Sequence, residues 1–239
     1  RMSNSNWYRP SAVRPTFKSK SYTYPWYDED SGKHVAIDIC EVRLTPEEYS
    51  WCYETKDKMA SAEWKETDYR KGVNPKAIFV GLISEVAIAK VFNLSVDGNY
   101  RERGDKVDFL VNGSIWDIKG AVSGFHMRNF LIYKDDQSRN HSANFKRKLG
   151  ADFYFLSHLD EGETDIGSDK NIIKKDGFAT VCVIGCIERE RVEELPPVKA
   201  RGKYSKHYNR EVLYNNPHVT SMKTLYEKSC EVELIQKEI

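Results

Sequence analysis

The chain has 239 residues, of which 40% are hydrophobic and 31% charged, with a formal net charge of +1. These values suit one globular domain and give no electrostatic reason to require or exclude a nucleic-acid partner. No apolar run approaches the roughly 20 residues that a membrane-spanning helix needs, so we expect no membrane partner. The five cysteines are an odd number without a CxxC pair, which argues against a disulfide framework and a thiolate zinc site. We therefore expect a cytoplasmic protein.

Residues 1–33 contain three prolines and no regular hydrophobic period, so we predict an irregular arm there. Basic and aromatic side chains alternate along it, a composition that can contact nucleic acid or pack on the core. Residues 34–239 are predicted to form a single domain, with a core at about 75–187.

The next segment predicts a strand followed by two helices. Residues 34–44 alternate between apolar and polar side chains, as a strand does. Thr45, Pro46 and Glu48 then supply an N-cap, a first-turn proline and the acid of a capping box, so a helix should run to about residue 67. A second, very apolar helix is predicted for 75–92.

The remainder of the sequence predicts short strands and two more helices. The strands are expected at 107–111, 114–119, 130–133, 152–158 and 178–187, with a loop at 161–176 and helices at 188–195 and 220–229. Together the elements predict an α+β fold of the α/β/α type, with a mixed central sheet and flanking helices.

Glu85 occupies an unusual place on the second predicted helix. At 100° per residue it lies in the middle of an apolar stripe formed by Ile78, Gly81, Leu82, Ile88, Ala89 and Phe92. An ionised carboxylate there costs several kcal/mol unless a cation or strong donors meet it. A metal ion could supply that charge, and so could a structural arginine or lysine.

Asn112 and Gly113 are a strong signal for a two-residue hairpin turn. With that turn, Asp108 falls opposite Asp117, and Lys119 shares a face with Asp117. A three-residue turn would send Asp108 to the other face, and Asp105 is a rival acid for the same role. Two close carboxylates favour a divalent cation, and oxygen-only ligands favour Mg²⁺ or Mn²⁺ over Zn²⁺.

These residues resemble the core of the PD-(D/E)XK nuclease superfamily. The resemblance rests on Gly81, Glu85 and Ala89, then Asp108 before an apolar strand, then Asp117, Ile118 and Lys119. Val107 stands where that superfamily usually has a proline. The similarity covers residues 75–187 and implies a restriction-endonuclease-like αβββαβ core.

The resemblance also implies roles for the residues. Asp108, Asp117 and the backbone carbonyl of Ile118 would bind Mg²⁺, with Mn²⁺ as a substitute. Glu85 would bind a second metal or orient a metal-bound water, and Lys119 would position the nucleophile. The implied activity is a DNA endonuclease of restriction, phage or defence type that leaves 5′-phosphate and 3′-hydroxyl ends.

Other functions remain open at this point. One is a catalytically silent DNA-binding module with the same fold, another is a structure-specific repair or recombination nuclease, and a third is a protein in which the acids form ordinary ion pairs. Candidate DNA contacts are His126, Arg128, Asn129, Lys146, Arg147 and Lys203. Cutting both strands of a duplex usually needs two active sites, so a homodimer is expected.

Overall fold

A computed structural model describes most of the chain. The described residues are 6–21, 27–28, 33–34, 36–66, 75–99, 107–122, 129–133, 150–164, 173–195, 197–199, 208–213 and 219–237.

Helices form at the places where the sequence predicts them. They are α1 (Pro46–Glu66), α2 (Pro75–Phe92), α3 (Arg189–Glu194) and α4 (Met222–Ser229). The predicted capping box starts α1: the Glu48 amide donates to the Thr45 hydroxyl at 3.2 Å, and the Thr45 amide donates to the Glu48 carboxylate at 2.7 Å. Local hydrogen bonding therefore sets where this helix begins.

The main sheet has eight strands in the order β15-β7-β8-β10-β11-β5-β2, with β14 paired to β11 beside that path. The strands are β2 (Phe17–Ser21), β5 (Ala36–Arg43), β7 (Phe109–Val111), β8 (Ser114–Val122), β10 (Phe153–Thr164), β11 (Ala179–Glu188), β14 (Thr220–Ser221) and β15 (Gln236–Lys237). β8 and β10 run parallel, whereas the other pairs of this sheet are antiparallel. The mixed sheet with flanking helices confirms the predicted α+β fold class.

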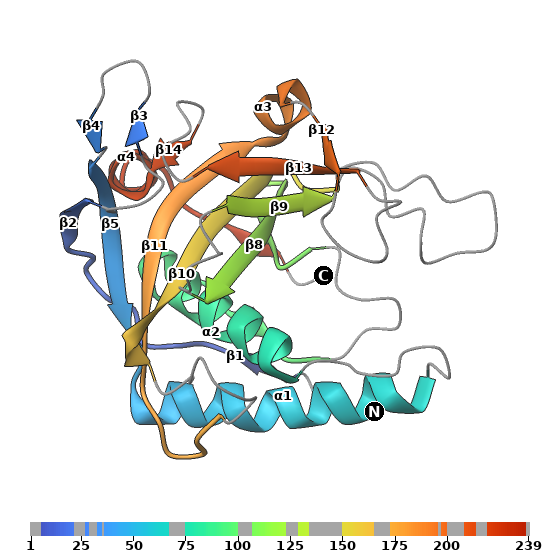
Figure 1. The fold of residues 1–239 in the computed structure, drawn as a ribbon. Coiled ribbons are helices and arrows are strands. Elements are labelled where there is room, and N and C mark those ends of the chain that lie inside the picture. Colours follow the sequence, from blue (N-terminus) through green and yellow to red (C-terminus); the bar gives the residue numbers. More distant parts are fainter. Residues whose placement is uncertain are drawn as a thin grey trace.

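Three smaller sheets accompany the main one. β1 (Trp7–Tyr8) pairs with β6 (Val96–Asp97), β3 (Tyr27–Asp28) pairs with β4 (Lys33–His34), and β12 (Pro197–Lys199), β13 (Tyr208–Leu213) and β9 (Asn129–Tyr133) form a three-stranded sheet. In Figure 1 the three-stranded sheet lies in front of the main sheet, whereas α2 lies behind it.

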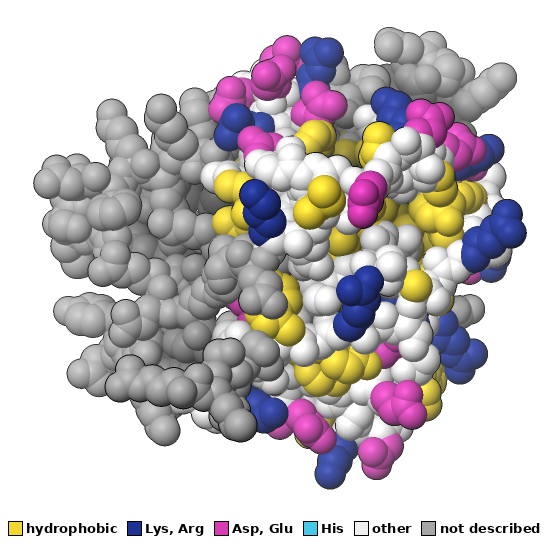
Figure 2. All heavy atoms as spheres, turned by 180° about the vertical axis from the view of Figure 1, so that it is seen from behind, with side chains coloured by type: hydrophobic (Ala, Val, Ile, Leu, Met, Phe, Trp, Pro, Cys, Tyr) yellow, Lys and Arg dark blue, Asp and Glu magenta, His cyan; other side chains and the backbone are white. Residues whose placement is uncertain are grey.

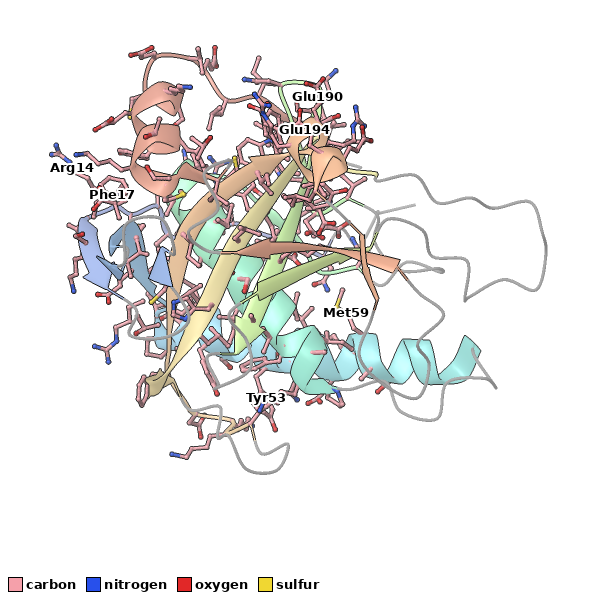
Figure 3. The ribbon with its side chains drawn as sticks, turned by 45° about the horizontal axis from the view of Figure 1, so that its top comes forward. Arg14, Phe17, Tyr53, Met59, Glu190 and Glu194 are labelled. Atoms are coloured by element: carbon pink, nitrogen blue, oxygen red, sulfur yellow. The ribbon has the colours of Figure 1, made fainter. Side chains whose placement is uncertain are left out.

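The two faces of the main sheet carry separate apolar clusters. The larger cluster includes Trp116, Ile118 and Phe155, and α1, α2 and α4 contribute to it. The smaller cluster, on the opposite face, includes Tyr154 and Val192 of α3. Figure 3 shows Tyr53 and Met59 on α1, and both pack against the larger cluster. α1, α2 and α4 therefore cover one face of the sheet, and α3 packs against the other.

α2 approaches β8 very closely at Gly120. A methyl group placed on Gly120 would lie 2.4 Å from the Ser84 hydroxyl oxygen and 3.1 Å from the carbonyl oxygen of Val80. Ring contacts continue this interface along β8, because Phe92 meets Trp116 edge-on at 5.3 Å between centroids. The missing side chain at Gly120 therefore sets the spacing between helix and strand.

Lys90 and Glu48 form an ion pair inside this core. The Lys90 ammonium lies 2.5 Å from the Glu48 carboxylate, and the two side chains are only 2% and 1% exposed. The backbone amide of Ser11 also donates to Glu48, at 3.1 Å. One carboxylate thus joins the N-terminal segment, α1 and α2. The sequence places Lys90 outside the apolar stripe of its helix, but α2 is buried on nearly every side.

The predicted irregular arm and the predicted 161–176 loop are partly wrong. Residues 17–21 form β2 on the edge of the main sheet (Figure 1), where Phe17 contacts Tyr226 of α4 at 6.0 Å between ring centroids. β10 continues to Thr164, so the loop begins later than expected. Short edge strands form because a partner pairs with them, and the local pattern carries little of that information.

The helices of the described residues include none that is long and apolar enough to cross a membrane.

Candidate active site

The predicted two-residue turn joins β7 and β8. Asn112 and Gly113 have φ values of 50° and 81°, which is the left-handed geometry that tight hairpin turns require. Val111 pairs with Ser114, and Phe109 pairs with Trp116. The turn and its register are confirmed, and the alternative three-residue turn is excluded.

Asp108 departs from the expected regular pair with Asp117. The ladder ends at Phe109, and the amide of Asp108 donates to the Trp116 carbonyl at 3.1 Å. The Asp108 carboxylate instead accepts the backbone N–H of Ile118. A short acidic side chain can replace a backbone acceptor in this way, so the carboxylate takes the place of the next rung of the ladder.

This bond also fixes the surroundings of the Ile118 carbonyl. The N–H and C=O groups of one strand residue point toward the same neighbouring strand. Because the Ile118 N–H meets Asp108, the Ile118 carbonyl faces the same edge of β8. The structure therefore brings Asp108 and the predicted carbonyl ligand to one edge.

Asp117 and Lys119 lie on one face of β8, as alternation predicts, and form an ion pair. The Lys119 nitrogen is 2.7 Å from a carboxylate oxygen of Asp117, and the side chains are 31% and 23% exposed. Solvent therefore reaches both groups, and the ammonium offsets the negative charge of the aspartate.

Tyr154 is a neighbour of Asp117 that the sequence does not single out. It lies beside Asp117 in the parallel register of β8 and β10, and it is buried. Burial, with a smaller contribution from the Asp117 charge, raises the pKa of the Tyr154 phenol to about 12. Tyr154 and Asp117 are 37 positions apart in sequence and become neighbours only because β8 pairs with β10. No local sequence pattern could therefore reveal this contact.

Glu85 belongs to α2, which packs on the other side of the sheet. α2 packs on the face of β8 that carries Trp116 and Ile118, whereas Asp117 and Lys119 leave the opposite face. Glu85 is partly exposed, and its charge raises the pKa of the buried Cys52 thiol of α1, second to burial itself. Leu82, Ile88, Ala89 and Phe92 of the predicted apolar stripe are buried, whereas Glu85 in its middle is partly exposed.

The described residues include Glu85, Asp108 and Asp117, yet within the described ranges no group of three or more His, Cys, Asp or Glu side chains could hold a metal ion. Two carboxylates with one backbone carbonyl form a smaller donor set, made only of oxygens. Such a set fits Mg²⁺, which is commonly held through one or two carboxylates and keeps several of its waters. Asp108, Asp117 and the Ile118 carbonyl therefore remain the candidate ligands.

The predicted DNA contacts lie almost entirely outside the described residues. These are His126, Arg128, Lys146, Arg147 and Lys203, and the rival acid Asp105 is also outside them. Asn129 is the first residue of β9. Figure 2 shows the face behind that of Figure 1, where the described basic and acidic side chains are interspersed. The described part of that face shows no field of a single sign.

Comparisons with known proteins add no family to this picture. The scan of protein-family models, the search of curated proteins and the search of solved structures each found no match to the chain.

Proposed function

We propose that the protein is a Mg²⁺-dependent phosphodiesterase that cuts DNA, with Asp108, Asp117 and Lys119 as its reactive side chains. The observation that carries the proposal is the arrangement of these residues at the end of the β7–β8 hairpin. The Asp108 carboxylate meets the Ile118 backbone there, and Asp117 and Lys119 form a solvent-accessible ion pair on the same strand. The resemblance to PD-(D/E)XK nucleases supports the same assignment.

The chemistry assigned to these residues follows from their charges. A bound Mg²⁺ would lower the pKa of a water molecule and neutralise charge that develops on the phosphate. Asp108 and Asp117 would hold the cation at the β8 edge. Lys119, which is paired with Asp117, presents its ammonium to the scissile phosphate and to the attacking water. In-line attack breaks the bond to the 3′ oxygen and leaves 5′-phosphate and 3′-hydroxyl ends.

A nuclease assay with matched variants tests the proposal. Supercoiled and linear DNA are incubated with the protein in Mg²⁺, in Mn²⁺ and in EDTA. We expect cutting with either metal and none in EDTA. Asp117→Asn and Lys119→Ala should each lower the rate on the order of 100-fold or more. The controls are Asp176→Asn and Lys175→Ala, two exposed residues outside α2, β7 and β8, which should cut like the unaltered protein.

The outcomes separate the alternatives. Equal cutting by the site variants and the controls would exclude this site. Binding of DNA without cutting, in every metal condition, would favour a catalytically silent DNA-binding module. A requirement for branched or flapped DNA would favour a structure-specific nuclease that uses the same residues.

A further inference from the structure

The segment 233–237, which we name the C-terminal strap, covers the outer edge of the candidate hairpin. Its strand β15 pairs with β7, with Gln236 opposite Val111 and Lys237 opposite Leu110. β7 has only three residues, and Asp108 directly precedes it. The strap therefore pairs with the short strand that leads to the Asp108 carboxylate.

The side chain of Gln236 ties this strap to the segment that follows α2. Its Nε2 donates to the Ser95 carbonyl at 2.7 Å, and its Oε1 accepts the Ser95 amide at 2.7 Å. Ser95 lies three positions after Phe92, the last residue of α2. A planar amide bonded at both ends fixes orientation as well as distance, so the end of α2 is held to β15.

Asn112 of the turn holds the other part of the strap. Its backbone amide donates to the Ile235 carbonyl at 2.9 Å, and its side-chain oxygen accepts the Ile235 amide at 2.8 Å. Its Nδ2 also donates to the Glu233 carbonyl at 3.2 Å. The strap is thus bonded to the hairpin turn through Asn112 and to the segment after α2 through Gln236.

Apolar packing alone does not fix β7 along its own axis. Phe109 and Val111 are buried in the larger cluster, which holds the strand against α2. Apolar contacts are not directional, whereas hydrogen bonds set the register of a strand. The strap supplies such bonds on the outer side of β7. On the inner side β7 pairs with β8, and the backbone amide and carboxylate of Asp108 make the last hydrogen bonds to β8.

We propose that Gln236 is a positioning residue that holds the Asp108 carboxylate at the Ile118 amide through β15 and β7. The catalytic consequence of this positioning rests on the proposed function, in which Asp108 is a metal ligand. The structural part does not depend on activity.

Hydrogen exchange of the Ile118 amide, measured by NMR on the metal-free protein, tests the structural part. Gln236→Ala should speed this exchange about tenfold, the size expected from the loss of two hydrogen bonds. The reference is the amide of Ile184 in the central strand β11, which should keep its rate. The control Lys237→Ala alters an exposed side chain of the same strand and should leave both amides unchanged.

A second variant removes the turn contacts without straining the turn. Asn112→Gly keeps the positive φ that the position requires and loses the two side-chain bonds to the strap. It should also speed exchange at Ile118 and leave Ile184 unchanged. An unchanged Ile118 rate in Gln236→Ala, or an equal acceleration at Ile118 and Ile184, would overturn the proposal.

The catalytic part is read from the Mg²⁺ dependence of cutting. Gln236→Ala should raise the Mg²⁺ concentration that gives half-maximal cutting, and Lys237→Ala should not. If exchange at Ile118 responds while the unaltered protein cuts no nucleic acid, the proposed function fails and the positioning by Gln236 stands. If cutting requires Asp117 but exchange and Mg²⁺ dependence ignore Gln236, the proposed function stands and this inference fails.

Discussion

Replacing Lys90 by methionine removes the cation of a buried ion pair while keeping most of the side-chain volume. Glu48 would stay behind at 1% exposure, with the Thr45 and Ser11 amides at 2.7 and 3.1 Å as its remaining donors. Removing one partner of a buried pair costs about 3–5 kcal/mol because the other charge loses its counter-ion in a poorly solvated site. The two amide bonds offset part of that cost, so we expect about 3 kcal/mol.

Urea unfolding followed by tryptophan fluorescence measures this loss. The double variant Glu48→Gln with Lys90→Met removes both charges and should recover part of the stability, because replacing a whole buried pair by neutral groups is often nearly neutral. Lys58→Met changes an exposed lysine of α1 and should stay within about 0.5 kcal/mol of the unaltered protein. A cost below about 1 kcal/mol for Lys90→Met, or no recovery in the double variant, would refute the reasoning.

Four further predictions concern the packing, the thiols and the two faces of the sheet. Gly120→Ala should destabilise the fold by about 1–3 kcal/mol, and adding Ser84→Ala should restore part of this in thermal unfolding, because the new methyl meets the Ser84 hydroxyl at 2.4 Å. Cys230 should be the one thiol of five that a disulfide reagent modifies rapidly in the folded protein, because the other four are buried. Burial raises the pKa of three of those four above the usual 9.0, so the unfolded chain loses these protons first and stability should fall as the pH rises above about 9. Glu85→Gln should lower the cutting rate far less than Asp117→Asn, since α2 packs on the face of β8 opposite to Asp117. Equal losses in a single-turnover assay would contradict this expectation.

Features encoded within a few residues could be predicted from the sequence. The capping box of Thr45 and Glu48 starts α1 where expected, and Asn112 with Gly113 sets the turn and the register of the hairpin. In each case the residues that decide the conformation also make the deciding hydrogen bonds or adopt the deciding dihedral angles. Because these residues are close together in the sequence, the local pattern is enough to predict the helix start and the hairpin turn.

The environment of the candidate site depends on partners that are distant in sequence. The regular pairing of Asp108 with Asp117 is lost because the Asp108 carboxylate accepts the backbone N–H of Ile118. Tyr154 lies beside Asp117 because β10 pairs in parallel with β8. The helical period locates Glu85 on its helix but cannot say which face of the sheet that helix covers. A periodic pattern gives the orientation of a residue within its own element, whereas the site depends on how the elements are placed together.

The two outer strands of the main sheet are short and come from segments far apart in the sequence. β2, with Lys18, borders β5, and the two-residue β15 borders β7. If either detached, β5 or β7 would present unpaired N–H and C=O groups to neighbouring molecules, which is how edge-to-edge aggregation begins. Charged or very short outer strands are poor templates for such pairing. Loss of either segment should therefore expose a longer strand edge to neighbouring molecules.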